Sequence, residues 1–253
     1  MHWRHVFKVV GVLTITLAVT MVIPLLVGLF YHDMSVHPFL LAIGATLAGG
    51  VAFYLTGPKD RLEFVSQREG MAIVALGWTV AGLFGALPFY FEGEFPTFVD
   101  AVFESVSGFT TTGASVLTDI EAVSKGLLLW RSLIQWLGGM GIIVLGIAIL
   151  PFLGIGGMQL YKAEVPTPVP DKLQPRIRDT SMILWKVYAL ITVLQVVALW
   201  AGGMSFYDAV NHALTTLPTG GFSTKNASVA QFDSLYFDLV ISFFMLLAGI
   251  NFS

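Results

Sequence analysis

Long apolar segments separated by short polar ones dominate the chain. Five of them run over residues 9–31, 38–56, 69–91, 126–153 and 180–201. A helix rises about 1.5 Å per residue and a bilayer core is about 30 Å thick, so each segment is long enough to cross a membrane. The pattern predicts an all-α polytopic membrane protein.

A sixth apolar segment, residues 98–109, is too short to cross. Its twelve residues would form a helix only about 18 Å long. The run Thr-Thr-Thr-Gly-Ala-Ser follows at residues 110–115. We therefore expect a half-length helix and a re-entrant pore loop whose exposed backbone could act as a ligand.

The composition narrows the class of protein. The 253 residues are 56% hydrophobic and 11% charged, whereas soluble chains carry about 25% charged residues. The net charge of −3 gives no indication of nucleic-acid binding, and the chain has no cysteine. Its five histidines are scattered. We expect no enzyme, because no nucleophile–base pair or metal cluster is evident.

The basic residues predict how the chain is oriented. They gather at the N-terminus, in the loop 57–68 and in the proline-rich segment 154–179. The positive-inside rule puts all three in the cytoplasm, together with the N-terminus, and leaves the acidic loop 92–96 outside. A re-entrant segment at 98–115 then lets the span 126–153 end in the cytoplasm.

An internal repeat appears when the chain is compared with itself at an offset of 108 residues. The matching pairs include Phe98 and Phe206, Asp100 and Asp208, Thr111 and Thr219, Gly113 and Gly221, and Ser115 and Ser223. Each copy contains a span, a half-helix, a Thr-x-Gly-x-Ser loop and a second span. Both copies begin on the cytoplasmic side, so they are parallel in topology.

The repeat sets the expected domain organisation. Two additional spans and a cytoplasmic loop occupy residues 1–68, and the first unit occupies 69–153. An extended, basic cytoplasmic linker is expected at 154–179, and the second unit occupies 180–253. Ser253 corresponds to a position inside the closing span of the first unit, so we expect the second unit to be incomplete and the full protein to continue.

The two repeated loops, residues 110–114 and 218–222, contain no ionised side chain. Any ion bound there would be held by backbone carbonyls and threonine hydroxyls, which suit weakly hydrated alkali cations. Gly113 and Gly221 permit positive φ angles. The alternative is that these glycines are ordinary helix C-caps. Two copies, each after a helix too short to cross, favour the filter.

Several ionisable residues flank the loops. Asp100 and Asp208 fall in the first turn of each half-helix, where a negative charge complements the helix dipole. Glu104, whose repeat partner is His212, is expected to have a buried hydrogen-bonding or ion-pairing role, with Arg131 as the candidate partner, rather than to contact the ion. Arg131 has the alternative of extending its side chain toward the lipid headgroups.

Three motifs carry a family resemblance: residues 103–115, 130–141 and 217–224. Through them the chain resembles the pore-forming membrane subunit of the Trk/Ktr potassium-uptake family, in particular the TrkH type, which also has two additional N-terminal spans. The resemblance implies four span–pore–span units around one pseudo-fourfold pore. It implies potassium uptake across the inner membrane. Only two of the four units are present here.

The resemblance also implies site residues and partners. The carbonyls of Thr111, Thr112, Thr219 and Gly220 are the expected K⁺ ligands. The complete set of candidate filter residues is Thr110, Thr111, Thr112, Gly113, Ala114, Thr219, Gly220, Gly221 and Phe222. K⁺ is the transported ion, and no other cofactor is expected. The implied partners are the lipid bilayer, a second copy in a homodimer and a cytoplasmic nucleotide-binding regulatory subunit.

A second function remains open at this point. The chain could be a secondary transporter that couples cation entry to H⁺ or Na⁺, that is, a symporter. Many such transporters are built from inverted repeats, and the parallel repeats found here argue against that class. Proton coupling would need an intramembrane carboxylate relay, for which Glu104 is the candidate.

Overall fold

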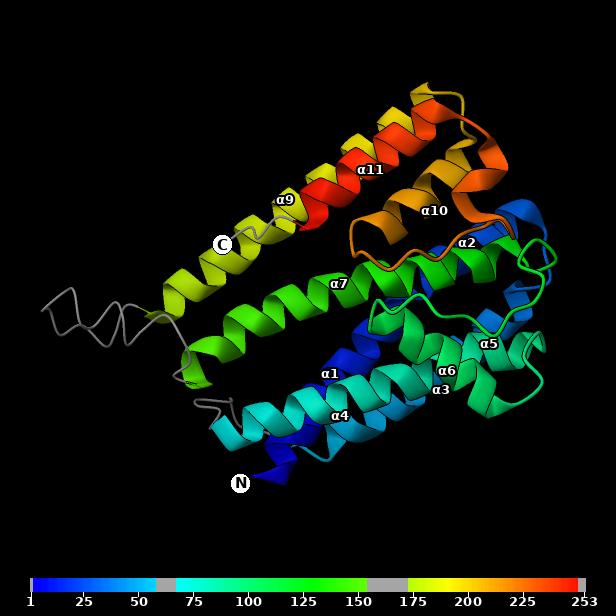
Figure 1. Ribbon diagram of the computed structural model, residues 1–253. Helices are drawn as coiled ribbons and strands as arrows, with labels where there is room; N and C mark the ends of the chain where they lie inside the picture. The colour runs from blue at the N-terminus through cyan, green and yellow to red at the C-terminus, as the bar shows by residue number, and fades with distance from the viewer. Residues whose placement is uncertain (1, 58–66, 154–172, 250–253) are drawn as a thin grey trace, which may run out of the picture.

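The computed structural model describes residues 2–57, 67–153 and 173–249, and within these ranges all regular structure is helical (Figure 1). The helices are α1 (Trp3–Thr20), α2 (Val22–Tyr31), α3 (Val36–Leu55), α4 (Gln67–Gly85), α5 (Leu87–Glu92), α6 (Phe98–Phe109), α7 (Lys125–Leu153), α9 (Leu173–Ala201), α10 (Phe206–Thr216), the short 3₁₀-helix η2 (Ser228–Phe232) and α11 (Leu235–Gly249). The predicted all-α class is confirmed.

Four segments are long and apolar enough to cross a membrane: Trp3–Tyr31, Val36–Leu55, Arg68–Glu92 and Met182–Ala201. They coincide with four of the predicted spans. The helix α7 has 29 residues, about 44 Å at 1.5 Å per residue, and occupies the fifth. The chain is a multi-pass membrane protein.

Proline explains why two of these spans consist of two helices. Between α1 and α2 the helix is interrupted at Met21, three residues before Pro24. Between α4 and α5 the interruption at Ala86 comes just before Pro88. Proline has no N–H to donate to the carbonyl four residues earlier, so the hydrogen-bond ladder breaks there.

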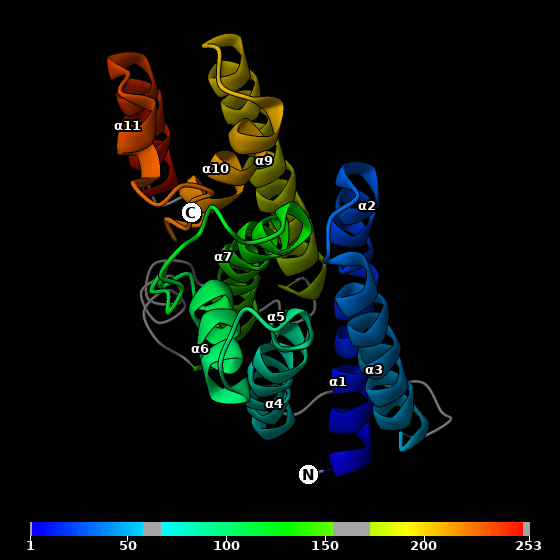
Figure 2. The same cartoon turned by 90° about the vertical axis from the view of Figure 1, so that its right-hand side faces the viewer.

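The helix α7 lies at the centre of the molecule. It contacts α2, α6, α9 and α10, and Figure 2 shows it between α10 above and α6 below, with α1–α3 to the right. Trp130 of α7 is fully buried and donates its indole N–H to the carbonyl of Gly85 at 2.9 Å. Its ring meets Phe39 edge to face at 6.3 Å, so α7 anchors the core.

The segment expected as an extended linker, residues 154–179, is partly helical. The helix α9 begins at Leu173, so the expectation is wrong for residues 173–179. Pro175 is only the third residue of α9, where a backbone N–H has no intrahelical acceptor, so proline is tolerated there. Residues 154–172 lie outside the described part of the chain.

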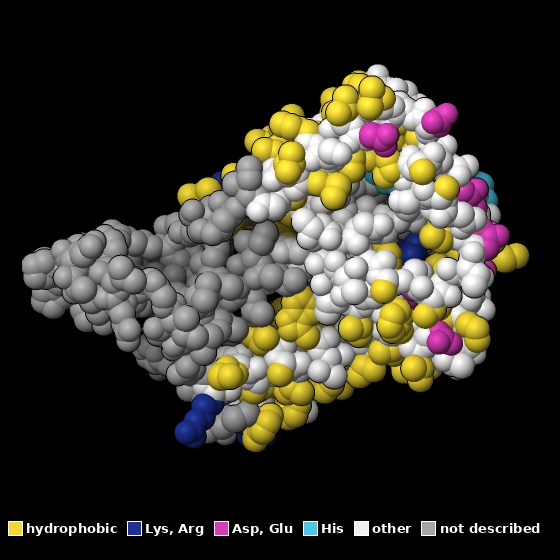
Figure 3. Space-filling view, in the orientation of Figure 1, with side chains coloured by type: hydrophobic (Ala, Val, Ile, Leu, Met, Phe, Trp, Pro, Cys, Tyr) yellow, Lys and Arg dark blue, Asp and Glu magenta, His cyan; other side chains and the backbone are white. Residues whose placement is uncertain are grey.

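Charge is distributed unevenly along the molecule. On the face drawn in Figure 3, acidic side chains gather at the end where α6 and α10 begin, and basic side chains mark the opposite end, near the N-terminus. The loops that follow the half-helices lie between these two ends (Figure 1). Both half-helices therefore begin at the acidic end of the molecule (Figure 1, Figure 3).

Candidate functional site

The two half-helices begin with the same side-chain cap. Thr97 Oγ1 accepts the Asp100 N–H at 3.2 Å, and Asp100 accepts the Thr97 N–H in return at 3.1 Å. In the second unit Ser205 Oγ accepts the Asp208 N–H at 3.1 Å. Such caps satisfy donors that the first helical turn leaves unpaired. Asp208 also accepts a hydrogen bond from Thr224 Oγ1 at 2.6 Å.

The loops that follow adopt the same backbone conformation. The φ angles are +57° at Thr111 and +58° at Thr219, then +76° at Gly113 and +82° at Gly221. Glycine accepts positive φ without strain, but a β-branched residue does not. Each threonine costs about 1–3 kcal/mol in this conformation. Strain present in both copies makes the two loops candidates for a functional site.

Hydrogen bonds to the ends of the half-helices hold these turns, and they too repeat at the offset of 108. The backbone pairs are Thr111 N–H to Gly108 O (2.9 Å), Thr219 N–H to Thr216 O (2.9 Å), Thr112 N–H to Ser107 O (2.9 Å) and Gly220 N–H to Thr215 O (3.0 Å). The sequence repeat is therefore a repeat of three-dimensional structure.

The two loops lie against each other. A Cβ atom on Gly113 would collide with the carbonyl oxygen of Gly220, so the approach requires a glycine. Between the loops lies the buried side chain of Gln135, whose Oε1 accepts the Phe222 N–H at 3.2 Å. A Cβ on Gly220 would lie only 2.5 Å from Gln135 Cδ.

Sequence reasoning did not assign Gln135 to the site. A signal was available, because Gln135 is a polar residue inside an apolar span, four residues after Arg131 and three before Gly138. That spacing puts all three residues on one face of a helix. A Cβ on Gly138 would collide with the Phe109 carbonyl, so this face of α7 supports the first loop directly.

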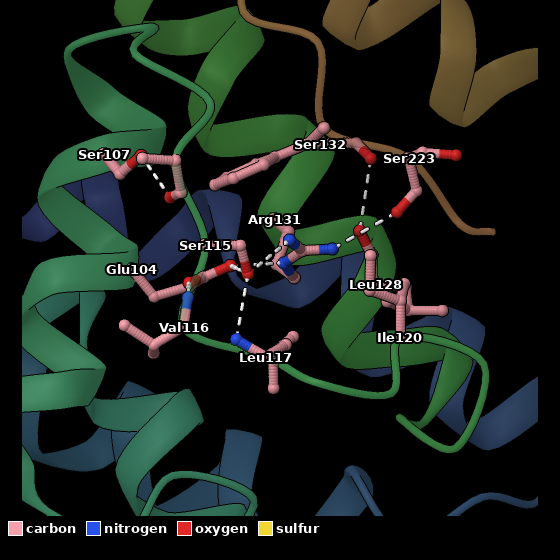
Figure 4. Close-up of polar contacts among 12 residues, drawn as sticks. Glu104, Ser107, Ser115, Val116, Leu117, Ile120, Leu128, Arg131, Ser132 and Ser223 are labelled. Atoms are coloured by element: carbon pink, nitrogen blue, oxygen red, sulfur yellow. Dashed lines mark hydrogen bonds and ion pairs between the residues drawn. The ribbon is translucent and has the colours of Figure 1, made fainter. Parts of the chain in front are cut away.

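Glu104 and Arg131 form the predicted ion pair (Figure 4). Arg131 Nε lies 2.7 Å from Glu104 Oε1, and both side chains are almost completely buried, with 1% and 0% exposed. The alternative in which Arg131 extends to the headgroups is wrong, because the carboxylate holds the guanidinium inside. Glu104 also accepts the Ser115 hydroxyl at 2.9 Å and the Val116 N–H at 3.2 Å.

Arg131 contacts both loops. Its Nη2 donates to Ser115 Oγ at 3.2 Å and its Nη1 donates to the Ser223 carbonyl at 3.2 Å. Its guanidinium carbon lies 4.2 Å from the centre of the Phe222 ring, a cation–π distance. Ser115 and Ser223 occupy equivalent positions of the repeat, so one side chain links equivalent points of the two units.

The second unit has no acid at the position of Glu104. His212 stands there, 3% exposed, with its ring 5.5 Å from that of Phe232. Its Nε2 has no hydrogen-bond partner among the described residues. The two loops therefore have similar backbone conformations, but the half-helix side chain at this position bonds to the loop in the first unit only, among the described residues.

The exposed surface of the loops is made largely of the predicted filter residues. The exposed ones are Thr110, Thr112, Ala114, Thr219 and Gly221, and the partly exposed ones are Thr111, Gly113 and Gly220. Phe222 differs, because its side chain is buried. The Ala114 carbonyl already accepts the Ser107 hydroxyl at 2.6 Å. Carbonyls and hydroxyls without ionised side chains suit an alkali cation.

Outside the filter residues, the two units also meet through Asn226. Its Oδ1 accepts the Ile120 N–H at 2.7 Å and its Nδ2 donates to Asp119 Oδ1 at 2.9 Å. The second bond stabilises the charged carboxylate and lowers the pKa of Asp119 below its ordinary value of 3.8. Asn226 thus adds an outer link between the units to the inner contacts made by Arg131 and Gln135.

Comparison with known proteins gives a consistent family. Over its full length the chain is 46% identical to the Trk system potassium uptake protein TrkH of Escherichia coli and 45% identical to that of Halomonas elongata. It covers 52% and 53% of those proteins. The chain thus spans about half the length of the curated relatives it matches.

A solved structure and a family model agree with these relatives. The crystal structure of the potassium transporter TrkH from Vibrio parahaemolyticus superposes with a TM-score of 0.87 at 38% identity, covering all of this chain and 51% of that one. The TrkH family model, described as a cation transport protein, matches residues 41–253. This chain therefore belongs to the TrkH family of cation transport proteins.

Proposed function

We propose that this chain supplies two filter segments of a potassium-uptake pore in the inner membrane, with its N-terminus in the cytoplasm. The observation that carries the proposal is the strained left-handed threonine, Thr111 or Thr219, followed two residues later by a left-handed glycine, in both units. A membrane potential of about 100 mV is worth about 2.3 kcal/mol per charge. An inward-negative potential of that size is enough to accumulate K⁺ through a selective pore.

The ion ligands in this proposal are backbone carbonyls of Thr111, Thr112, Thr219 and Gly220. Carbonyl groups that replace the hydration shell favour weakly hydrated K⁺ over smaller ions. The contact between Gly113 and the Gly220 carbonyl supports the proposal, because it brings the two segments together.

Potassium is the proposed substrate because the relatives are named potassium uptake proteins. Two segments make half of a fourfold filter, so the full pore needs two further span–pore–span units. We also propose a homodimer and a cytoplasmic nucleotide-binding regulatory subunit as partners. The charge distribution, with basic residues at the end near the N-terminus, supports the proposed orientation.

The geometry disfavours coupling to H⁺. A proton relay would need Glu104 to bind and release protons along the ion path. Its carboxylate is instead buried and engaged by Arg131, Ser115 and Val116. A carboxylate held by these three contacts supports the loop and is not free to act as a relay, so we favour the channel-like pore over the symporter.

The test replaces Gly113 by Ser in the full-length protein and measures uptake of K⁺, Rb⁺, Na⁺ and Li⁺. The added Cβ meets the Gly220 carbonyl and strains a φ of +76°, so discrimination between K⁺ and Na⁺ should fall. The matched control is Gly203→Ser, also at positive φ (+101°) but with open space around it and no contact with the loops. Unchanged K⁺/Na⁺ discrimination in Gly113→Ser would refute the filter assignment.

A further inference from the structure

We propose that Arg131 is a shared positioning residue that sets the spacing of the two filter loops, an inference that rests on the proposed function. Its guanidinium does not touch the expected ion ligands. It contacts the residue that directly follows each loop, which is Ser115 after residues 110–114 and Ser223 after residues 218–222. Because these positions are equivalent, moving Arg131 would shift one loop relative to the other.

The local turn at each serine is the same. Ser115 Oγ accepts the Leu117 N–H at 3.1 Å, and Ser223 Oγ accepts the Lys225 N–H at 3.0 Å. The two serines therefore make the same turn bond within their own loops. They differ in the atom that faces Arg131, which is the hydroxyl of Ser115 and the backbone carbonyl of Ser223.

The asymmetry between Glu104 and His212 explains why one arginine serves both units. In the first unit Glu104 holds the loop through the Ser115 hydroxyl and the Val116 N–H. In the second unit the side chain of His212 makes no such bond among the described residues. Arg131 supplies the missing support from the neighbouring unit through the Ser223 carbonyl.

The shape of the guanidinium suits this role. Arg131 donates from Nε to Glu104, from Nη2 to Ser115 and from Nη1 to Ser223. The guanidinium is planar and rigid, so the angles between these three donors are fixed. The bond to Glu104 therefore sets the direction of the other two donors. A lysine ammonium is a point charge on a flexible stem and lacks the rigid fork. Charge alone would not keep the two loops at a fixed separation.

The first experiment compares Arg131→Lys with the unaltered full-length protein, with the K⁺/Na⁺ uptake ratio as the readout. We expect the ratio to fall roughly tenfold, as for the loss of one hydrogen bond to a charged group. The control is Ser132→Ala, the adjacent buried residue, which bonds to Leu128 and Asn211 rather than to the loops. A ratio in Arg131→Lys equal to that of the unaltered protein would overturn the inference.

A pair of serine variants tests the inference if Arg131→Lys does not assemble. Ser115→Ala removes the hydroxyl that meets Arg131 and its partner Glu104, whereas Ser223→Ala removes an equivalent hydroxyl but leaves the carbonyl contact with Arg131. We expect selectivity to fall in Ser115→Ala and to stay near the unaltered value in Ser223→Ala. Equal effects would mean that the serines act only within their own turns, which overturns the inference.

The proposed function can fail separately. If the unaltered protein does not prefer K⁺ over Na⁺, the filter itself is wrong. If the unaltered protein is selective and neither Arg131→Lys nor Ser115→Ala lowers its selectivity, the filter stands and the positioning role of Arg131 is wrong.

Discussion

Thr111 and Thr219 hold a left-handed backbone although branching at Cβ disfavours it. A glycine at either place would remove the strain, so the hydroxyl or the stiffness of threonine is retained at a cost. The Thr219 hydroxyl bonds to the adjacent Pro218 carbonyl at 2.7 Å. At the scale of the residue, the candidate site consists of backbone held in place by its neighbours, and the proposed ligands include no ionised side chain.

The buried ion pair gives a prediction about stability. Replacing Glu104 by Gln leaves the Arg131 guanidinium buried without a countercharge, which should lower the free energy of unfolding by about 3–5 kcal/mol. Thermal unfolding of the purified full-length protein measures the loss. The double variant Glu104→Gln with Arg131→Met removes the orphaned charge and should regain part of the stability. A double variant less stable than the single one would contradict this account.

Some of these residues were predictable and others were not. The places of Asp100 and Asp208 in the first helical turn were predicted, because the start of each half-helix depends on nearby residues. The partner of Glu104 was also predicted, since an acid and a base in neighbouring apolar segments have few alternatives. The contact between Arg131 and Ser223 was not, because it joins residues 92 apart and depends on how the units pack.

At the scale of the element, α7 supports both loops along one face. A Cβ on Gly138 would collide with the Phe109 carbonyl, and one on Gly139 would lie 2.6 Å from Pro218 Cβ. These glycines allow the helix to approach the end of each half-helix. The bounds of α6 were predicted because an apolar run followed by a polar loop is a local signal. The start of α9 was missed because proline occurs both in linkers and in the first turn of helices.

This packing predicts a contrast between two alanine variants. Gly138→Ala should displace the first loop and lower both transport and thermal stability. In Gly141→Ala, one turn further along α7, the new Cβ would lie 3.5 Å from Trp78, an ordinary contact. Alanine there should be neutral or gain up to about 1 kcal/mol of helix stability. Uptake assays and unfolding temperatures of both variants test the contrast, which equal behaviour would contradict.

At the scale of the whole molecule, the bridge at Asn226 predicts a pH dependence. The folded protein lowers the pKa of Asp119 below 3.8. The stabilisation is therefore present above the ordinary pKa and is lost as the pH falls through the lowered one. The stability difference between the unaltered protein and Asn226→Ala should shrink between pH 6 and pH 3.

Unfolding temperatures of both proteins across that range provide the measurement. The bond from the Ile120 N–H to Asn226 does not titrate, so part of the difference should remain at low pH. Asp119→Asn serves as the control, because it keeps a polar group without the titration. A difference that is constant with pH would show that the Asp119 carboxylate contributes nothing to the bridge.

The link between Arg131 and Ser223 also has a consequence for the order of synthesis. Ribosomes add roughly 5–20 residues per second, so Ser223 emerges about 5–18 s after Arg131, from which it is separated by 92 residues. During that interval Glu104 is already available to Arg131 as a countercharge, whereas the Nη1 donor has yet to meet the Ser223 carbonyl. The link between the two units is therefore completed only after the second unit has been synthesised.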